Sequence, residues 1–416
     1  ASRIAEYVGR AFRVATSGRP GPVALALPED MLRQLVEAQK SIPYTAAKAH
    51  PSVHDVSKVK SILETAERPL LMLGGSGWTN EAVKQIQSFA ENNNLPVTVS
   101  FRCQDRFNNN HDNYIGDMGI GANPALVKRM QDADVLMVLG SRLGEMTTNG
   151  YERISAPVPE QTLIHIHQGA EELGHVYQPD LAINATPATI APALSEMKLS
   201  GSERWTAGTK AARAAFEAWT VPTDNPGPVK VAALYEHMRS ALPADTIICN
   251  GAGNYAAWLH RFYRYETFPS QLAPTSGAMG YGVPAAIAAK ITNPERPVVA
   301  FAGDGCFMMN ATDLATAAHY NANVVFLVFN NSMYGTIRMH QERDYPVRVS
   351  GTELTNPDFV AFARSFGLHA DKVEATEDFA PALDAAMNAG KPALIEITID
   401  PDAIAPTATI SGLRGK

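Results

Sequence analysis

The chain has 416 residues, 45% of them hydrophobic, which is enough for two or three domains with packed cores. Its formal net charge of -7, without basic clusters, argues against a nucleic-acid partner. No run approaches the roughly eighteen uncharged apolar residues of a membrane span, and residues 1–20 lack a signal peptide's apolar middle, so we expect no membrane partner and a cytoplasmic location.

The start of the chain is predicted to be a helix followed by the short apolar strand VALAL at residues 23–27, with no sheet of its own. A lone strand must pair with another strand to satisfy its backbone groups. We therefore interpret residues 1–35 as the C-terminal remnant of a domain that begins outside this chain.

Residues 50–190 alternate apolar runs with helix-like segments, which is typical of a doubly wound parallel sheet. The runs are PLLMLG, PVTVSF, DVLMVLG and TLIHIH. A glycine-rich turn, GGSG at residues 74–77, follows the first run, and Thr79 or Asn80 could cap the helix after it. Such a turn could seat a nucleotide phosphate, so we expect a central Rossmann-like domain here.

A polar, alanine-rich stretch at residues 191–228 ends in three prolines and is expected to be a linker. Residues 229–416 then repeat the alternation, with the runs DTIICN, PVVAFAG, NVVFLVFN and ALIEITI. The predicted fold class is α/β, with two doubly wound parallel-sheet domains and the tail of a third.

Polar residues follow two of these buried runs. Gly303-Asp304-Gly305 comes after the first and Asn330-Asn331 after the second, and Asn310 is expected to cap a helix between them. A strand–helix–strand unit of this kind has parallel strands and a right-handed connection. Both polar tips should therefore lie at the carboxyl edge of the sheet, where open α/β sheets bind ligands.

Asp304 and Asn331 offer hard oxygen ligands, and the glycines beside Asp304 allow close backbone approach. One carboxylate and one amide leave the remaining ligands to water, a backbone carbonyl and phosphate, as is common for Mg²⁺. Either motif alone would more simply be a turn after a strand. Their joint placement on one unit favours a metal site.

GDG, 24 intervening residues and NN resemble the thiamine diphosphate-binding motif of the thiamine diphosphate-dependent 2-oxo acid decarboxylases and carboligases. By this resemblance, Asp304 and the Asn331 side chain are expected to bind Mg²⁺ together with the backbone carbonyl of Met333. The metal would then grip the diphosphate of the cofactor.

Two further segments fit this resemblance. The loop from Gly251 to Tyr255 is suited to phosphate oxygens, although Asn254 and Tyr255 depart from the Gln-His of the acetolactate synthase branch. SGAMGYG resembles that branch closely: Met279 would bend the cofactor into its V shape, unless it is ordinary core packing. The resemblance assigns these residues to the cofactor site: Gly251, Gly253, Asn254, Tyr255, Gly277, Met279, Gly303, Asp304, Gly305, Cys306, Asn331, Met333, Tyr334, Gly335 and Thr336.

Three other side chains are candidates for a functional role. Cys306 could be a nucleophile, but no histidine stands beside it, so a structural role is favoured; with Cys103 and Cys249 it forms no CxxC pair. His319 is expected to be a helix-surface or packing histidine. His340 aligns with the Trp that shapes the acceptor pocket of acetolactate synthases, and it is our candidate for the substrate pocket.

The resemblance also extends to the rest of the chain. In acetolactate synthases the central domain holds FAD, which makes FAD a candidate here, although Arg142 to Met146 depart from the family's FAD-contacting stretch. Residues 17–32 resemble the end of the pyrimidine-binding domain. The glutamate that activates the cofactor in this family lies in that domain, so the resemblance implies no catalytic residue in this chain.

The predicted function is thiamine diphosphate- and Mg²⁺-dependent decarboxylation of a 2-oxo acid with carboligation, as in acetolactate synthases. The expected partners are a small-molecule 2-oxo acid, the missing N-terminal domain and further copies of the chain in a homodimer or homotetramer. One alternative is a non-ligating 2-oxo acid decarboxylase or aldehyde lyase on the same machinery. Another is a nucleotide-binding paralogue without catalysis.

Overall fold

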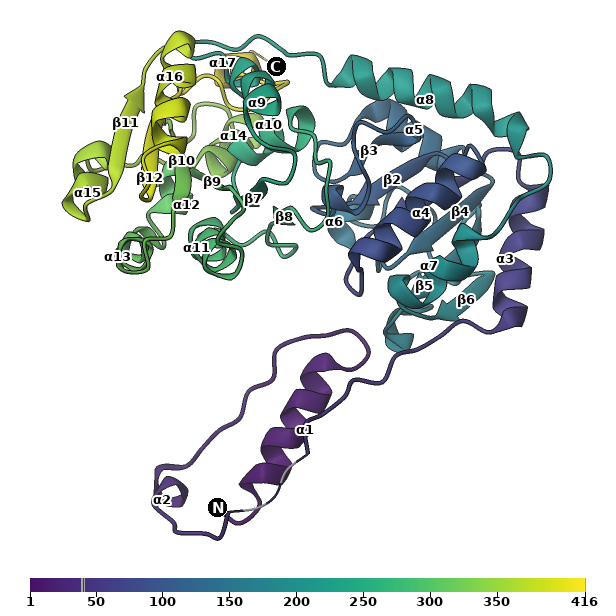
Figure 1. The fold of residues 1–416 in the computed structure, drawn as a ribbon. Helices are drawn as coiled ribbons and strands as arrows, with labels where there is room; N and C mark the ends of the chain where they lie inside the picture. Colours follow the sequence, from purple (N-terminus) through teal and green to yellow (C-terminus); the bar gives the residue numbers. More distant parts are fainter. Residues whose placement is uncertain (39, 41, 416) are drawn as a thin grey trace. The chain divides into compact units, whose positions relative to one another are not determined.

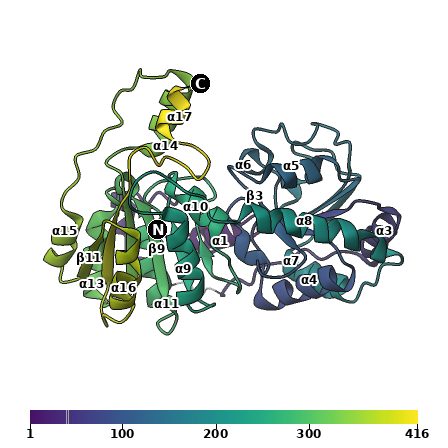
Figure 2. The same ribbon diagram turned by 90° about the horizontal axis from the view of Figure 1, so that it is seen from above.

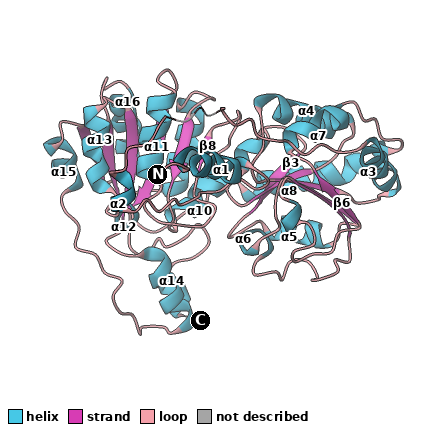
Figure 3. Ribbon diagram, turned by 90° about the horizontal axis from the view of Figure 1, so that it is seen from below, coloured by secondary structure: helices cyan, strands magenta, loops and turns pink. Residues whose placement is uncertain are grey.

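The computed structural model describes residues 1–38, 40 and 42–415, and it contains two six-stranded sheets with helices on both faces (Figures 1 and 3). Two compact units can be distinguished. One consists of residues 1–100 and 127–210, and the other of residues 101–126 and 211–416. Within the described residues, no helix has both the length and the apolar character needed to cross a membrane.

Among the described residues of 1–50 are two helices, α1 (Ile4–Thr16) and α2 (Glu29–Leu32), and neither has a buried residue. The prediction of a strand at residues 23–27 was wrong. This segment is irregular and exposed, and neither sheet contains it. An apolar run becomes a strand only where a neighbouring strand accepts its backbone hydrogen bonds.

The first sheet has the strand order β3-β2-β1-β4-β5-β6. Leu71 of β1 lies opposite Val97 of β2, and Leu70 lies opposite Leu136 of β4, both in parallel register. The strands are β1 (Leu70–Leu73), β2 (Val97–Ser100), β3 (Tyr114–Met118), β4 (Val135–Leu139), β5 (Thr162–His167) and β6 (Leu181–Asn184).

The helices between residues 53 and 219 are α3 (Val53–Thr65), α4 (Asn80–Asn92), α5 (Pro124–Gln131), α6 (Glu145–Thr148), α7 (Pro187–Ser195) and α8 (Thr206–Trp219), with 3₁₀ turns η1 (Gln104–Arg106), η2 (Ala170–Glu172) and η3 (Ser202–Trp205). The Thr79 hydroxyl caps α4 by accepting from the Ala82 N–H, as predicted. Residues 202–219, expected to be a linker, form η3 and α8.

The second sheet has the strand order β11-β12-β10-β9-β7-β8. Its strands are β7 (Ile247–Asn250), β8 (Gln271–Leu272), β9 (Val298–Gly303), β10 (Val324–Asn330), β11 (His369–Val373) and β12 (Ala393–Thr398). The helices around it are α9 (Val231–Ala241), α10 (Tyr255–Phe262), α11 (Gly282–Thr292), α12 (Asp304–Phe307), α13 (Leu314–His319), α14 (Gly335–Asp344), α15 (Phe359–Ser365), α16 (Thr376–Met387) and α17 (Ile410–Arg414), with the 3₁₀ turn η4 (Ala311–Asp313).

Alternate residues of the central strands face two separate apolar cores of the second sheet, because side chains alternate across a strand. Val299 and Phe301 pack on one face with residues of α9, α10 and α16. Val298 and Ala300 pack on the other face with residues of α11, α13 and α15. The sheet is covered on both faces, which leaves its edges for ligands.

Candidate functional site

The two polar strand tips meet as predicted. β9 and β10 pair in parallel, with Gly303 opposite Phe329, so Asp304 and Asn331 follow adjacent strands at the same edge of the sheet. Asp304 opens the short helix α12 and is 2% exposed. The turn between the tips differs from expectation in one respect: the Asn310 side chain does not cap a helix but donates to the Gly280 carbonyl at 2.8 Å.

The Asp304 carboxylate is buried without a cationic side chain among its described partners. Oδ1 accepts from the Gly305 N–H at 2.9 Å, and Oδ2 accepts from Nδ2 of Asn356 at 2.8 Å. Burial raises the pKa of Asp304, and these hydrogen bonds oppose that rise. A buried carboxylate of this kind is suited to a cation supplied from outside the chain.

Asn356 is a residue of this site that the sequence analysis missed. Its Nδ2 atom also donates to Oδ1 of Asn330 at 2.9 Å, so one amide links the two strand tips. Asn330 itself donates to Glu396 of β12 at 2.7 Å. Asn356 lies in an irregular loop 25 residues beyond Asn331, and no local pattern distinguishes it from other polar loop residues.

The segment after Asn331 is held by a short antiparallel bridge between Met333 and Glu353. The Tyr334 N–H donates to Thr352 and the Leu354 N–H donates to Ser332, so the bridge uses neither the Met333 carbonyl nor the Asn331 side chain. The Asn331 oxygen Oδ1 accepts from the Met333 N–H at 3.3 Å. The Asp304 carboxylate, the Asn331 amide and the Met333 carbonyl offer oxygen atoms of the kind that Mg²⁺ prefers, and a metal site formed by the three stays a prediction.

Tyr255 and Cys306 form a buried pair beneath this edge. The Tyr255 hydroxyl is 3.7 Å from Cys306 Sγ, and the ring stacks on Phe329 with centroids 6.0 Å apart. Cys306 accepts from the Gly280 N–H at 3.2 Å, and a Cβ at Gly251 would lie only 2.3 Å from its sulfur. These contacts support the structural role expected for Cys306 and turn the Tyr255 hydroxyl toward the protein interior.

Asn254 connects three parts of the site. Its Oδ1 atom accepts from the Thr336 hydroxyl at 2.8 Å, and its Nδ2 atom donates to the Ile404 carbonyl at 2.9 Å. The loop from Gly251 to Tyr255, our phosphate-loop candidate, therefore lies next to the start of α14. The Tyr334 ring covers Gly305, where an added Cβ would lie 2.6 Å from it.

The segment expected to hold the pyrimidine lies between β8 and α11. Gly277 adopts a φ of 75°, a conformation that favours glycine, and Met279 packs partly buried against an apolar core. A Cβ at Gly282 would lie 2.9 Å from the Gly251 N–H, so this segment approaches the phosphate-loop candidate closely. Both readings of Met279, wedge and core packing, are compatible with this place.

His340 and the GGSG turn are the remaining candidates for functional sites. His340 is exposed on α14, with Nδ1 2.8 Å from a guanidinium nitrogen of Arg343. The GGSG turn at residues 74–77 follows β1, and the indole N–H of Trp78 donates to the Gly74 carbonyl at 2.8 Å. The turn is closely packed, because a Cβ at Gly75 would lie 1.8 Å from the Gly140 carbonyl. FAD at this turn stays a prediction.

Comparison with known proteins fits this geometry. Residues 251–397 match the C-terminal TPP-binding domain of thiamine pyrophosphate enzymes, and residues 56–194 match the central domain of the same enzymes. The first match contains both strand tips and the phosphate-loop candidate. The chain belongs to the family of thiamine pyrophosphate enzymes, whose central and C-terminal domains it contains.

Several relatives are similar over nearly the whole chain. The acetolactate synthase isozyme 2 large subunit of Escherichia coli is 27% identical over 403 residues, covering 95% of this chain and 72% of that protein. The acetolactate synthase of Bacillus subtilis is 27% identical over 407 residues, covering 95% and 70%. The sulfoacetaldehyde acetyltransferase of Alcaligenes xylosoxydans xylosoxydans is 28% identical over 429 residues, covering 95% and 71%.

Proposed function

We propose that this chain binds thiamine diphosphate together with Mg²⁺ and serves an enzyme that decarboxylates a 2-oxo acid and joins the remaining fragment to a second carbonyl compound. The observation that carries the proposal is the placement of Asp304 and Asn331 at the tips of adjacent parallel strands, with the Asp304 carboxylate buried and without a described cationic partner. Bound thiamine diphosphate supplies the carbon nucleophile and the electron sink for decarboxylation.

In this proposal each residue has a limited role. Asp304, the Asn331 amide and the Met333 carbonyl hold the metal, while Asn356 orients Asp304. No cluster of three or more His, Cys, Asp or Glu side chains suited to a metal occurs among the described residues, so the proposed site depends on one carboxylate and on phosphate ligands. Asn254 and Thr336, which are joined by a hydrogen bond, position the diphosphate in this proposal.

A second candidate is a lyase or decarboxylase that does not use a 2-oxo acid acceptor. His340 stands where acetolactate synthases have an acceptor-shaping Trp, and it is exposed beside Arg343. The similar identities of acetolactate synthases and a sulfoacetaldehyde acetyltransferase do not distinguish their substrates for this chain. His340→Trp should shift product distribution toward ligation with a small 2-oxo acid if this position faces the acceptor, and unchanged products would remove it from the pocket.

The proposal is tested first by calorimetric titration of the protein with thiamine diphosphate, with Mg²⁺ and with EDTA. We expect saturable binding that needs the metal. The second step measures CO₂ release and products from a panel of 2-oxo acids, alone and with an aldehyde acceptor. Metal-independent binding would overturn the metal site, and CO₂ release with only simple aldehydes formed would favour the non-ligating candidate.

A further inference from the structure

Arg102 is a buried cation that the proposed function does not yet use. The residue is 6% exposed and directly follows Phe101 at the start of the segment 101–126, which belongs to the second unit. It carries a φ of 58°, a left-handed conformation that is uncommon for a residue with a side chain. Such backbone strain is found most often at functional sites.

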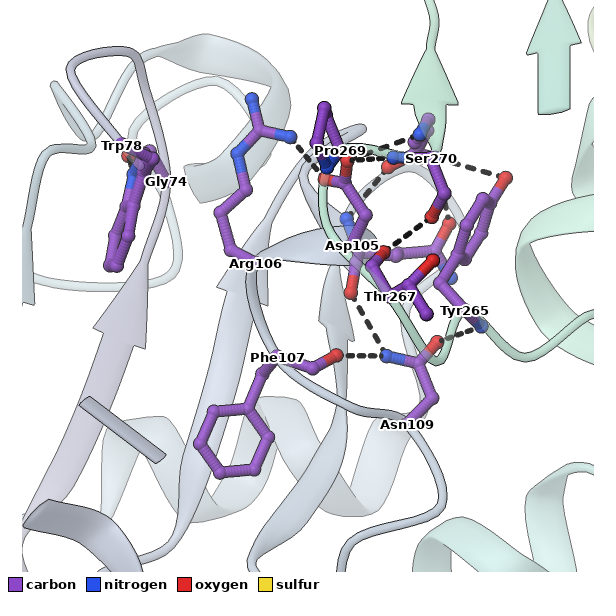
Figure 4. A network of polar contacts seen from close by, with 12 residues as sticks. Gly74, Trp78, Asp105, Arg106, Phe107, Asn109, Tyr265, Thr267, Pro269 and Ser270 are labelled. Atoms are coloured by element: carbon purple, nitrogen blue, oxygen red, sulfur yellow. Dashed lines mark hydrogen bonds and ion pairs between the residues drawn. The ribbon is translucent and has the colours of Figure 1, made fainter. Parts of the chain in front are cut away.

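Figure 4 shows that Asp105 and Asn109, a few residues beyond Arg102 in the sequence, are hydrogen-bonded to the segment from Tyr265 to Ser270. The Asp105 carboxylate accepts from the backbone N–H groups of Ser270 and Gln271 at 3.0 and 3.1 Å. Asn109 exchanges two hydrogen bonds with the backbone of Tyr265, at 2.8 and 3.0 Å. These hydrogen bonds hold the backbone that directly follows Arg102.

The guanidinium group of Arg102 is incompletely satisfied. Nη1 donates to the Pro274 carbonyl at 2.5 Å, at the start of the segment that carries Gly277 and Met279. Nε is enclosed without a hydrogen-bond partner, and none of the ion pairs among the described residues includes this side chain. Buried charges are normally paired, so this cation lacks an anion.

The surroundings of Arg102 connect it to the cofactor site. The Arg102 guanidinium lies over the Phe101 ring, 4.7 Å from its centroid, and that ring packs edge-on against His260 of α10, the helix that begins at Tyr255. Burial lowers the pKa of Arg102, and the charges of Tyr255 and Cys306 oppose that effect. His260 is a second neighbour: its Nε2 atom is also enclosed without a partner, and the Arg102 charge together with burial lowers its pKa to about 3. The unpartnered Nε–H of the Arg102 guanidinium is suited to an oxygen acceptor.

We propose that Arg102 binds an anionic oxygen group of the reactants at the cofactor site, either the carboxylate of the 2-oxo acid or the diphosphate of the cofactor. This inference rests on the proposed function and deepens it. Arg is suited to both anions because its planar fork donates two parallel hydrogen bonds.

The test compares the wild-type protein with Arg102→Met and Arg102→Lys. Affinity for thiamine diphosphate is measured by calorimetry in Mg²⁺. Affinity for pyruvate and for its neutral ester, methyl pyruvate, is measured on the protein loaded with a cofactor analogue blocked at C2, which prevents turnover. If the anion is the carboxylate, Arg102→Met weakens pyruvate binding on the order of ten- to a hundredfold and leaves methyl pyruvate within about twofold.

If the anion is the diphosphate, the same loss is found for thiamine diphosphate instead. Arg102→Lys keeps the charge without the planar fork and should show an intermediate loss; it decides the question if Arg102→Met does not fold. Arg213→Met is the matched control, because Arg213 is a largely buried arginine that is already bonded to the carbonyls of Asn109, His111 and Tyr114.

The control should lower thermal stability without changing the ratio of pyruvate to methyl pyruvate affinity. Unchanged affinities for all three ligands in both Arg102 variants would overturn the inference. Arg102 would then have only a structural role, as a donor to the Pro274 carbonyl. The proposed function fails separately, if the wild-type protein itself binds no thiamine diphosphate.

Discussion

The polar side chains at the strand tips of the second sheet differ in how many hydrogen bonds they make within the protein. Asp304 keeps a buried carboxylate with only amide and N–H donors, while Asn330 is fully engaged with Asn356, Ser332 and Glu396. Of the two adjacent asparagines, Asn330 thus links the strand ends, whereas the described side-chain bond of Asn331 is the one from the Met333 N–H, which leaves it suited to the metal site that we propose. The physical difference is the number of hydrogen bonds that each already makes within the protein.

The first residue-scale prediction concerns Asp304→Ala. We expect Mg²⁺-dependent binding of thiamine diphosphate to fall by at least a hundredfold, since the only carboxylate of the proposed metal site is removed. The midpoint of thermal unfolding without ligand should stay within a few degrees, because no buried cation loses its partner. Retained cofactor affinity would refute the metal assignment.

Asn356→Ala is predicted to have a smaller effect of the same kind. The metal ligands remain, but Asp304 loses the amide that orients it, so cofactor affinity should fall on the order of tenfold. Asn388→Ala is a suitable control, because among the described residues the Asn388 amide donates only to the Asp384 carbonyl of its own helix, on an exposed surface. Equal affinities for the two variants would show that Asn356 only supports its loop.

At the scale of elements, the short helix α17 depends on one buried carboxylate of α14. Glu342 is fully buried and accepts from Arg338 at 2.9 Å, from Arg414 at 2.6 and 3.0 Å, and from the Val347 N–H at 3.0 Å. Figure 2 shows the two helices together at the end of the second unit. These contacts attach the C-terminal turn to the element that follows the Asn331 tip.

Glu342→Gln should therefore release α17 and destabilise this region by about 3 kcal/mol, since removal of one partner leaves two arginines without their counter-charge. Amide hydrogen exchange is expected to rise at residues 410–414 and in α14, while β9 and β10 stay protected. Arg343→Gln, on the exposed side of the same helix, is the control and should leave this exchange unchanged. Protected α17 amides in Glu342→Gln would contradict the role assigned to the cluster.

The same cluster predicts a pH dependence. Hydrogen bonds from Arg414 and the other donors lower the pKa of Glu342 from 4.5 to about 2. A lowered folded pKa adds stability above the unfolded value, and this stability is lost as pH falls from about 4.5 toward about 2. The difference in unfolding free energy between wild type and Glu342→Gln should shrink in that range. A difference that stayed constant down to about pH 2 would show that Glu342 is not the group responsible for this pH dependence.

At the scale of the whole molecule, two sheets with their own cores lie in one chain, and the proposed cofactor site belongs to the second. We expect calorimetry to resolve two unfolding transitions. Thiamine diphosphate with Mg²⁺ should raise one of them, by about 2.7 kcal/mol at a hundredfold excess over the dissociation constant. EDTA should abolish the shift, and equal shifts of both transitions would show that the two units unfold as one.

The sequence predicted the central strands well and missed the four at the sheet edges. The inner strands β1, β2, β4, β5, β7, β9, β10 and β12 are predominantly apolar, because inner strands of a parallel sheet are buried on both faces. β3, β6, β8 and β11 are the edge strands, and they are short or contain polar residues, so no apolar run marks them. Residues 23–27 show the opposite error, an apolar run without a sheet to join.

For the site, the sequence by itself determined the α/β class, the parallel strands and the meeting of Asp304 with Asn331, because these depend on the local order of strand, helix and strand. Only the tertiary structure decided that Asn356 links the two tips, that the Tyr255 hydroxyl turns toward Cys306, and that Arg102 approaches Pro274. These contacts join residues 26 to 172 positions apart. Their partners are chosen by loop packing across the sheet, for which the sequence carries no periodic signal.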